Sequence, residues 1–460
     1  MALLIRNGQI VTSNDSYRAD IYCEAETITQ IGSQLAAPPG ATVVDAAGKY
    51  VFPGFIDPHV HIHLPFMGTH AKDTYETASR AAIVGGTTTL IEMICPSRSD
   101  EPLAAFDLWK ARGVGHSACD FTFHMGVTRF DALAESQLRE IVKAGLSSFK
   151  VFLAYRGAFG VDDAELYHTM RLAKELGVIV TAHCENADLV SERCKMLLSQ
   201  GKTGPEWHEP SRPEYVEAEG VHHLMSFAAA HGTHCYIVHT SCEPAVREAL
   251  LARAKGAKVW IETLIQYLTL DKTHAELPDF EGSKFVMSPP LRDKRNQAFL
   301  WDNLANGNIS TLATDHAPFD FKGQKEMGRG DFTKIPNGIP SLEDRVNVFF
   351  TEGVKTGRID INRFVDAAST QAAKLFGLYP RKGAIQLGSD ADLVIYDPNY
   401  KGTISVKNQL MAVDYNPFEG RQISGRPSVV VVRGQIAARD GKFTGDPIRG
   451  QYLKREPSHF

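Results

Sequence analysis

The feature that most constrains the fold is an alternation of strand-like and helical stretches between about residue 53 and residue 380. Runs rich in β-branched residues alternate with segments of helical apolar spacing, such as 162–176 and 243–255. Eight β-then-α units favour a closed parallel (β/α)8 TIM-like barrel, with its chemistry at the carboxyl ends of the strands. An open doubly wound sheet is the alternative, but no glycine-rich fingerprint follows an early strand. The predicted strands end near His61, Glu92, Met125, Lys150, His183, His239, Glu262 and Asp315.

Both ends of the 460-residue chain carry short strand patterns instead. In the segment 3–11, Asn7-Gly8 predicts a hairpin turn, and a similar phrase returns at 429–437. Neither end is long enough for a core of its own, so we expect the two to pack together as a small β-sandwich. The predicted domains are the sandwich, formed by 1–52 and by 381–460 with the C-terminal tail, and the barrel at 53–380.

Composition excludes several classes of function. The hydrophobic fraction of 43% and the charged fraction of 22% are typical of a soluble globular protein. A net charge of -5 gives no reason to expect nucleic acid or an anionic membrane as partner, and no apolar run has the length of a membrane span. The seven cysteines are scattered without CxxC pairs, and the N-terminus enters a strand pattern directly. We therefore expect a cytoplasmic protein with reduced thiols.

Two histidines lie at the end of the first predicted barrel strand. Because side chains alternate along a strand, His59 and His61 point to the same face, where two imidazoles can bind one transition-metal ion. Asp57 is placed to orient these imidazoles as a neighbouring carboxylate, and Glu262 to support the site from another strand end. The alternative is a pair of surface histidines.

Three further strands end in residues of the same chemical kind, namely His183, His239 and Asp315. A barrel brings such strand ends together at its mouth. With the first pair of histidines they provide five nitrogen or oxygen ligands, which is more than one tetrahedral zinc requires. The surplus indicates two metal ions.

Lys150 ends another predicted strand, where a cation is unexpected beside metal ions. An ammonium has no lone pair for a metal. Two neighbouring cations repel each other, and a bridging anion offsets that repulsion. Lys150 fits if its amine has reacted with carbon dioxide to form a carbamate, whose two oxygens bridge the metals. The alternative is an ordinary lysine paired with a carboxylate.

The chain closely resembles the cyclic amidohydrolases, specifically the hydantoinase/dihydropyrimidinase branch and its D-hydantoinase type. The resemblance covers essentially the whole chain. It implies a metal-dependent barrel beside a small β-sandwich, a homotetramer, and two divalent cations, Zn²⁺ or alternatively Mn²⁺ or Co²⁺. The motifs that carry it lie at 53–61, 85–89, 148–150, 182–186, 288–292, 314–316 and 335–340.

The resemblance also implies a role for each site residue. His59, His61 and Asp315 would hold one metal, and His183 and His239 the other. Carbamylated Lys150 and a hydroxide would bridge them. Tyr155 would stabilise the oxyanion, and the backbone at Ser288 and Asn337 would hold the cyclic amide.

Such a site can open a ring amide. The hydroxide would attack the carbonyl, and Asp315 would accept a proton and pass it to the departing ring nitrogen, giving an N-carbamoyl amino acid. The substrate is a small molecule whose apolar side group we expect to contact a lid. The lid residues are Leu64, Phe66, Phe152 and Phe159, for which ordinary loop packing is the alternative reading.

The apolar lid favours 5-monosubstituted hydantoins and dihydropyrimidines. Relatives that bind dihydroorotate carry an arginine where this chain has His63, so a carboxylated ring lacks its bidentate partner here. An allantoinase-like ureide hydrolase is an alternative, although the polar ureido group suits this lid poorly. A single-metal deaminase and a non-catalytic dihydropyrimidinase-related scaffold protein are further alternatives, disfavoured by Lys150 and by the complete ligand set.

Overall fold

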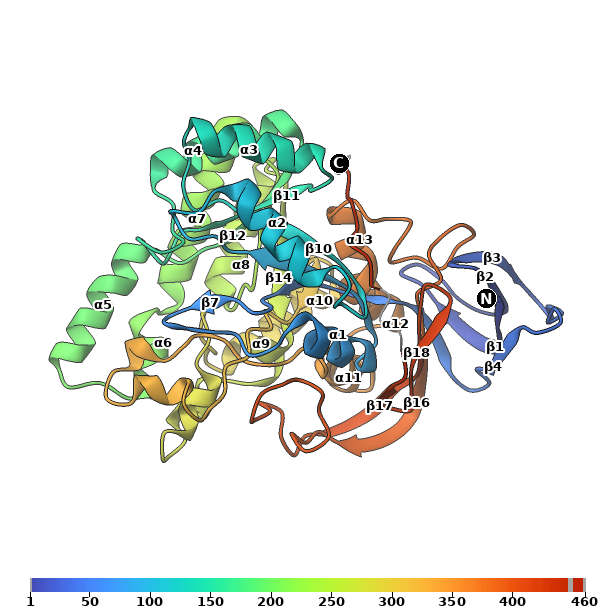
Figure 1. Cartoon of the computed structure of the whole chain (residues 1–460). Coiled ribbons are helices and arrows are strands. Elements are labelled where there is room, and N and C mark those ends of the chain that lie inside the picture. The colour runs from blue at the N-terminus through green and yellow to red at the C-terminus, as the bar shows by residue number, and fades with distance from the viewer. Residues whose placement is uncertain (1, 446–449, 458–460) are drawn as a thin grey trace.

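The computed structural model of the chain describes residues 2–445 and 450–457. Its centre is a sheet of eight parallel strands that are neighbours in chain order (Figure 1). A bridge between Val60 and His316, with His61 N donating to His316 O at 2.8 Å, joins the last strand to the first. The sheet therefore closes, which confirms the predicted barrel and excludes the open sheet. The barrel strands are β6 (Phe55–Val60), β9 (Thr87–Ile94), β10 (Asp120–Gly126), β11 (Ser148–Phe152), β12 (Ile179–His183), β13 (Cys235–Ile237), β14 (Val259–Leu264) and β15 (Thr311–Ala313).

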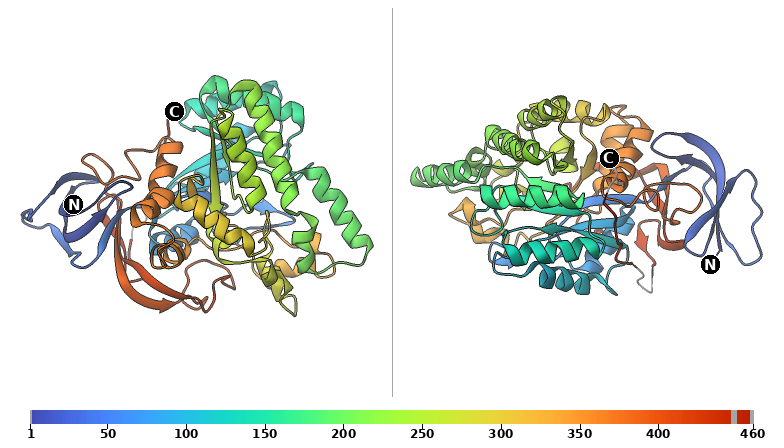
Figure 2. Two further views of the ribbon diagram at one scale, coloured as in Figure 1. Left: turned by 180° about the vertical axis from the view of Figure 1, so that it is seen from behind. Right: turned by 90° about the horizontal axis from the view of Figure 1, so that it is seen from above.

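Helices cover the outside of the barrel (Figure 2). In α4, Asp162 accepts a hydrogen bond from Glu165 N in a capping box, and Gly177 ends the helix with φ 69°. The predicted segments 162–176 and 243–255 are thus helical, as α4 and α8. The helices are α1 (Tyr75–Val84), α2 (Pro102–Gly113), α3 (Ala132–Lys143), α4 (Asp163–Leu176), α5 (Ala187–Ser199), α6 (His208–Ser211), α7 (Glu214–His231), α8 (Glu243–Ala254), α9 (Ile265–Thr269), α10 (Arg295–Ala305), α11 (Arg345–Phe349), α12 (Ile361–Val365) and α13 (Gln371–Leu375).

The two ends of the chain build one mixed sheet beside the barrel (Figures 1 and 2). Strands β5 and β16 pair antiparallel, with Tyr50 opposite Tyr396, and so connect the two ends. The shared β-unit is confirmed, whereas the domain boundaries 1–52, 53–380 and 381–460 stay a prediction. The strands are β1 (Ala2–Val11), β2 (Ser16–Glu24), β3 (Thr27–Gly32), β4 (Thr42–Asp45), β5 (Tyr50–Pro53), β16 (Leu393–Thr403), β17 (Gln422–Val432), β18 (Gln435–Arg439) and β19 (Lys442–Phe443).

The predicted hairpin at Asn7-Gly8 is wrong. Strand β1 continues through both residues, and its pairing with β2 shifts register there, so the extra residue forms a bulge. Asn7 has φ 63°, and a Cβ on Gly8 would lie 2.5 Å from Val51 Cγ2 on β5. The similar phrase near the other end does turn, because Arg433 and Gly434 (φ 44° and 74°) connect β17 to β18.

The last described residues close the amino-terminal end of the barrel. Tyr452 forms a parallel bridge with Phe121 of β10. The buried Arg455 donates hydrogen bonds to Thr122 Oγ1 at 3.1 Å and to Ser148 Oγ at 2.9 Å. These contacts attach the C-terminal segment to the end of the barrel opposite the predicted site.

The described residues include no helix of the length and apolarity needed to cross a membrane. All seven cysteines fall within the described ranges and are free thiols. The reduced state of these thiols and the cytoplasmic location both stay predictions.

Candidate metal centre

One pocket at the carboxyl ends of the barrel strands brings together all the residues predicted for the site. Strand alternation accounts for the residues on β6, β11 and β12, and loops after the strands supply the others. Three further residues complete the wall and were not foreseen, namely Cys95, Ala317 and Gly338. The predicted residues that line the pocket are His59, His61, Leu64, Phe66, Lys150, Phe152, Tyr155, Phe159, His183, His239, Ser288, Asp315 and Asn337.

The first group of candidate ligands is His59, His61 and Asp315, all buried, with one ligand atom of each within 4.8 Å of the others. The Nε2 atoms of both histidines lie 3.1 Å from Asp315 Oδ1. Burial lowers the pKa of His59 well below its ordinary value, so the imidazole is neutral and keeps a lone pair. Burial acts to raise the pKa of Asp315, but the two histidines hold it below its ordinary value.

The second group is His183 and His239. Nδ1 of His183 faces Nε2 of His239 at 2.9 Å, and the other ring nitrogen of His183 lies 2.9 Å from Glu185 Oε2. Burial, with the neighbouring His183, lowers the pKa of His239 well below its ordinary value. Two ring nitrogens that face each other in this way fit the coordination of one cation between them.

Lys150 lines the same pocket as the two groups and is fully buried. Among the described residues, its Nζ has no hydrogen-bond partner and no carboxylate within ion-pair distance. Burial lowers the pKa of Lys150 to about 8. The alternative of a lysine paired with a carboxylate is therefore not observed, and the isolated amine fits a group that is modified or that faces an anion.

Glu262 on β14 orients the imidazole of His59 and holds the backbone of His239. Its Oε1 lies 2.7 Å from His59 Nδ1 and accepts a hydrogen bond from His239 N at 2.8 Å, while Oε2 accepts one from Tyr236 at 2.7 Å. With Nδ1 of His59 engaged, Nε2 is the nitrogen left for a metal. The supporting role expected of Glu262 is thus seen in its contacts.

The orienting role predicted for Asp57 is wrong. Its carboxylate accepts hydrogen bonds from Thr314 Oγ1 at 2.7 Å and from the backbone N of His59 at 3.3 Å, and Arg345 lies 3.7 Å away. Asp57 therefore fixes the backbone beside two candidate ligands and contacts no imidazole of the site. The pairing of β6 with β9 shifts register between Asp57 and Val60, and Asp57 meets Thr314, the residue after β15, instead of an imidazole.

Aromatic rings form one wall of the pocket. The rings of Phe66 and Phe159 stack with centroids 5.9 Å apart, and Tyr155 meets Phe66 edge-on at 5.5 Å. Phe152 lies 5.6 Å from Phe159. Phe66 comes from a two-stranded loop, β7 (Pro65–Phe66) and β8 (Thr69–His70), over the mouth. The rings predicted to form a lid are thus in mutual contact.

A buried ion pair connects the second histidine group to Ser288 on the pocket wall. Arg212 Nη1 lies 3.0 Å from Glu185 Oε2 and 3.0 Å from Ser288 Oγ. Glu185 in turn contacts His183. Sequence reasoning missed Arg212, because it lies between α6 and α7 and no strand pattern marks it.

The sequence and the fold were compared with those of known proteins, and the comparison identifies a family. The description "Amidohydrolase family" matches residues 50–437 of the chain. The chain belongs to this family. It is 48% identical over 457 residues to a D-hydantoinase of Geobacillus stearothermophilus, covering 99% of this chain and 97% of that one. A dihydropyrimidinase of Dictyostelium discoideum is 39% identical over 458 residues, covering 99% and 91%.

A solved structure of a D-hydantoinase (dihydropyrimidinase) from Thermus sp. superposes with a TM-score of 0.98 at 62% identity, over 100% of both chains. These amidohydrolases confirm the resemblance to the hydantoinase/dihydropyrimidinase branch. They also confirm the fold predicted for the chain, a barrel with a β-unit from both ends.

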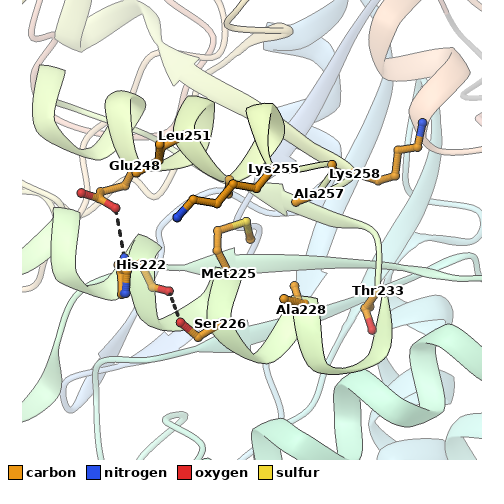
Figure 3. Close-up of a pocket in the computed structure, with 14 residues that line it drawn as sticks. His222, Met225, Ser226, Ala228, Thr233, Glu248, Leu251, Lys255, Ala257 and Lys258 are labelled. Carbon is orange, nitrogen blue, oxygen red and sulfur yellow. Dashed lines mark hydrogen bonds and ion pairs between the residues drawn. The ribbon is translucent and has the colours of Figure 1, made fainter.

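The amidohydrolase has another hollow on its surface, between α7 and α8 (Figure 3). Its lining includes Met225, Ala228 and Leu251, with His222 Nδ1 3.1 Å from Glu248 Oε2. None of the predicted site residues borders it. The barrel pocket is therefore where the predicted chemistry is concentrated.

Proposed function

We propose that this amidohydrolase hydrolyses the ring amide of 5-monosubstituted hydantoins and dihydropyrimidines to N-carbamoyl amino acids, with a D-hydantoinase type of preference. One observation carries the proposal: the complete set of candidate ligands and a wall of aromatic rings line the same pocket. The names of the relatives, D-hydantoinase and dihydropyrimidinase, support the same class of substrate.

The donor atoms fit two divalent cations, for which we propose Zn²⁺, with Mn²⁺ or Co²⁺ as alternatives. His59, His61 and Asp315 would hold one ion. His183 and His239 would hold the other, with carbamylated Lys150 between the two. When bound, such a pair supplies a water of lowered pKa and a positive charge for the carbonyl oxygen.

Two side chains would move or hold protons. The lowered pKa of Asp315 keeps its carboxylate ionised, ready to take a proton from the attacking water and pass it to the ring nitrogen. Burial raises the pKa of Tyr155 and keeps its phenol protonated, so that the hydroxyl donates to the carbonyl oxygen as negative charge develops. The backbone at Ser288 and Asn337 would hold the ring amide.

The lid determines the preferred side group in this proposal. Leu64, Phe66 and Phe159 present apolar surface, which suits an apolar group at ring position 5 better than a polar ureido group. His63 does not line this pocket and packs against His70 with ring centroids 4.9 Å apart, so this position offers a ring carboxylate no counterpart of the arginine of dihydroorotate-binding relatives. These contacts favour hydantoins over allantoin and dihydroorotate.

A turnover panel tests the substrate class, with hydantoin, a 5-aryl hydantoin, dihydrouracil, allantoin and dihydroorotate at equal concentration. We expect the 5-aryl hydantoin and dihydrouracil to be hydrolysed, and allantoin and dihydroorotate to be poor substrates. Preferred turnover of allantoin would instead support the ureide hydrolase, and an inactive, metal-free protein would support the scaffold.

Metal analysis tests the cation pair. We expect two equivalents of metal per chain in fully active protein, and loss of activity on chelation that added Zn²⁺ restores. Clearly less than two equivalents at full activity would favour a single-metal enzyme. The resemblance also leads us to propose a homotetramer, which light scattering of the purified protein measures.

A further inference from the structure

Lys325 is a buried cation that the proposed chemistry does not use. It lies in the loop after β15, in a short 3-10 helix (Lys325–Gly328), and has no exposed surface. Its Nζ donates to three backbone carbonyls, Val286 O at 2.7 Å, Pro336 O at 2.6 Å and Gly338 O at 2.7 Å. The side chain thus connects the segment at Val286 to the segment 336–338, about 50 residues later in the chain, through main-chain atoms alone.

The number of acceptors identifies the protonated form. An ammonium has three N–H groups, one for each carbonyl, whereas a neutral amine has two. Burial lowers the pKa of Lys325 well below its ordinary value, and the three carbonyl dipoles act against that shift by favouring the ammonium. A buried charge without a carboxylate costs free energy, so an apolar side chain would be the cheaper filler. What the cation adds is a fixed distance between the segments that it joins.

The segment that begins at Val286 and the segment 336–338 both carry residues proposed to bind the substrate. Val286 O also accepts a hydrogen bond from Gly338 N at 3.0 Å, so the two segments are paired directly beneath the pocket. Ser288 follows two residues after Val286, and both Ser288 and Gly338 line the pocket. A Cβ on Gly338 would lie 2.5 Å from Ala317 O, which shows how closely this pair packs against the pocket wall.

The carbonyl of Pro336 belongs to the same peptide unit as the N–H of Asn337. A positive charge 2.6 Å from that carbonyl oxygen polarises the whole amide and makes its N–H a stronger donor. Asn337 lines the pocket beside Tyr155 and Ser288. Lys325 thereby influences a group that faces the substrate without reaching the pocket itself.

We propose that Lys325 is a positioning residue for substrate recognition. It sets the spacing between the backbone at Ser288 and the backbone at Asn337, and it strengthens the Asn337 amide as a donor to the ring. The inference rests on the proposed function, since these two backbone segments are the ones assigned to the cyclic amide. It adds a specificity-determining residue outside the pocket wall.

The test compares Lys325→Met with Lys334→Met in the full-length, metal-loaded enzyme, with a hydantoin as substrate. Lys334 is a matched control, because it lies in the same loop with its side chain 70% exposed. For Lys325→Met we expect KM to rise about tenfold, as one hydrogen bond to the ring weakens, with kcat and metal content close to those of the unchanged enzyme. The Lys334→Met control should have the KM, kcat and metal content of the enzyme without substitution.

A second substitution covers the case in which Lys325→Met does not fold. Lys325→Arg keeps the charge, but its planar fork cannot serve three carbonyls in the same geometry, so the same rise in KM is expected. An unchanged KM in either folded variant would overturn the inference while leaving the proposed function intact. Joint loss of kcat, metal and thermal stability would assign Lys325 a purely structural role. If the enzyme without any substitution hydrolysed no ring amide, the proposed function and the inference would be overturned together.

Discussion

Three residues at the barrel mouth hold their backbone in the left-handed region. They are His239, Asp315 and Tyr155, with φ of 40°, 49° and 58°. A non-glycine residue in this region costs on the order of 1–3 kcal/mol and persists only where its surroundings fix it. The sharp bend directs each side chain into the pocket just beyond its strand. Strain of this kind gathers where side-chain direction matters most.

The phenol of Tyr155 gives the first prediction. Tyr155→Phe removes the proposed oxyanion donor and should raise the barrier by roughly 3 kcal/mol, seen mainly as a lower kcat. Steady-state kinetics with a hydantoin measures the change, and Tyr167→Phe on the exposed face of α4 is the control. A rise in KM with kcat preserved would instead show that Tyr155 binds the substrate and the transition state equally well.

The second prediction concerns Lys150. Lys150→Ala should abolish activity and reduce bound metal, because the proposed negative bridge between the two proposed cations would be lost. Short carboxylic acids such as propionate should restore part of the activity by supplying that charge. Lys143→Ala, at the exposed end of α3, is the control. Undiminished activity in Lys150→Ala would disprove the carbamate bridge.

At this scale the sequence predicts ligands better than the residues that support them. Period-two alternation and strand ends suffice to place His59, His61 and Lys150 in one mouth. The choice between Asp57 and Glu262 as the orienting carboxylate depends on how strands distant in the chain meet across the barrel. Arg212 depends on a loop path, for which no local pattern exists.

Among the elements, the loop 405–416 packs on a carboxylate that titrates far from its usual range. Leu410 N donates to Glu343 Oε2 at 2.7 Å. Burial, together with the charge of Asp344, raises the pKa of Glu343 to about 8 from 4.5. The folded protein therefore holds this proton more tightly than the unfolded chain does. The stability that the proton contributes is complete below pH 4.5 and is lost as the pH rises through about 8.

Glu343→Gln mimics the protonated side chain at every pH. We expect the variant to gain thermal stability over the unchanged protein as the pH rises from about 5 to about 9, where the buried carboxylate ionises. Melting temperatures across this range measure the difference, with Glu140→Gln on the exposed face of α3 as the control. A difference that stayed constant with pH would contradict the shifted pKa.

Elements show the same limit of sequence reasoning as residues do. Helices with caps and apolar spacing, such as α4, are fixed locally and were predicted well. The two similar phrases near the chain ends adopt a bulge at Asn7-Gly8 and a turn at Arg433-Gly434. Tertiary pairing decides between them. Beyond the bulge β1 continues along β5, whereas β17 ends at Val432 and the chain returns beside it as β18.

For the whole molecule, Arg455 joins the C-terminal segment to the barrel. Arg455→Met leaves Thr122 and Ser148 without their donor and should lower the free energy of unfolding by about 1–3 kcal/mol. Thermal or denaturant unfolding measures the loss, and the neighbouring exposed Lys454→Met is the control. Metal content should not change, because the contacts lie at the opposite end of the barrel. Loss of metal in Arg455→Met would show that the two ends are coupled.

The attachment of both chain ends has a consequence for biosynthesis. Strand β5 has only β1 beside it until β16 emerges from the ribosome, and the barrel floor is open until Arg455 does. A nascent chain that already contains all eight barrel strands thus still exposes apolar surface and unpaired strand edges. Interrupted translation would release an aggregation-prone fragment, so chaperone demand should peak late in synthesis.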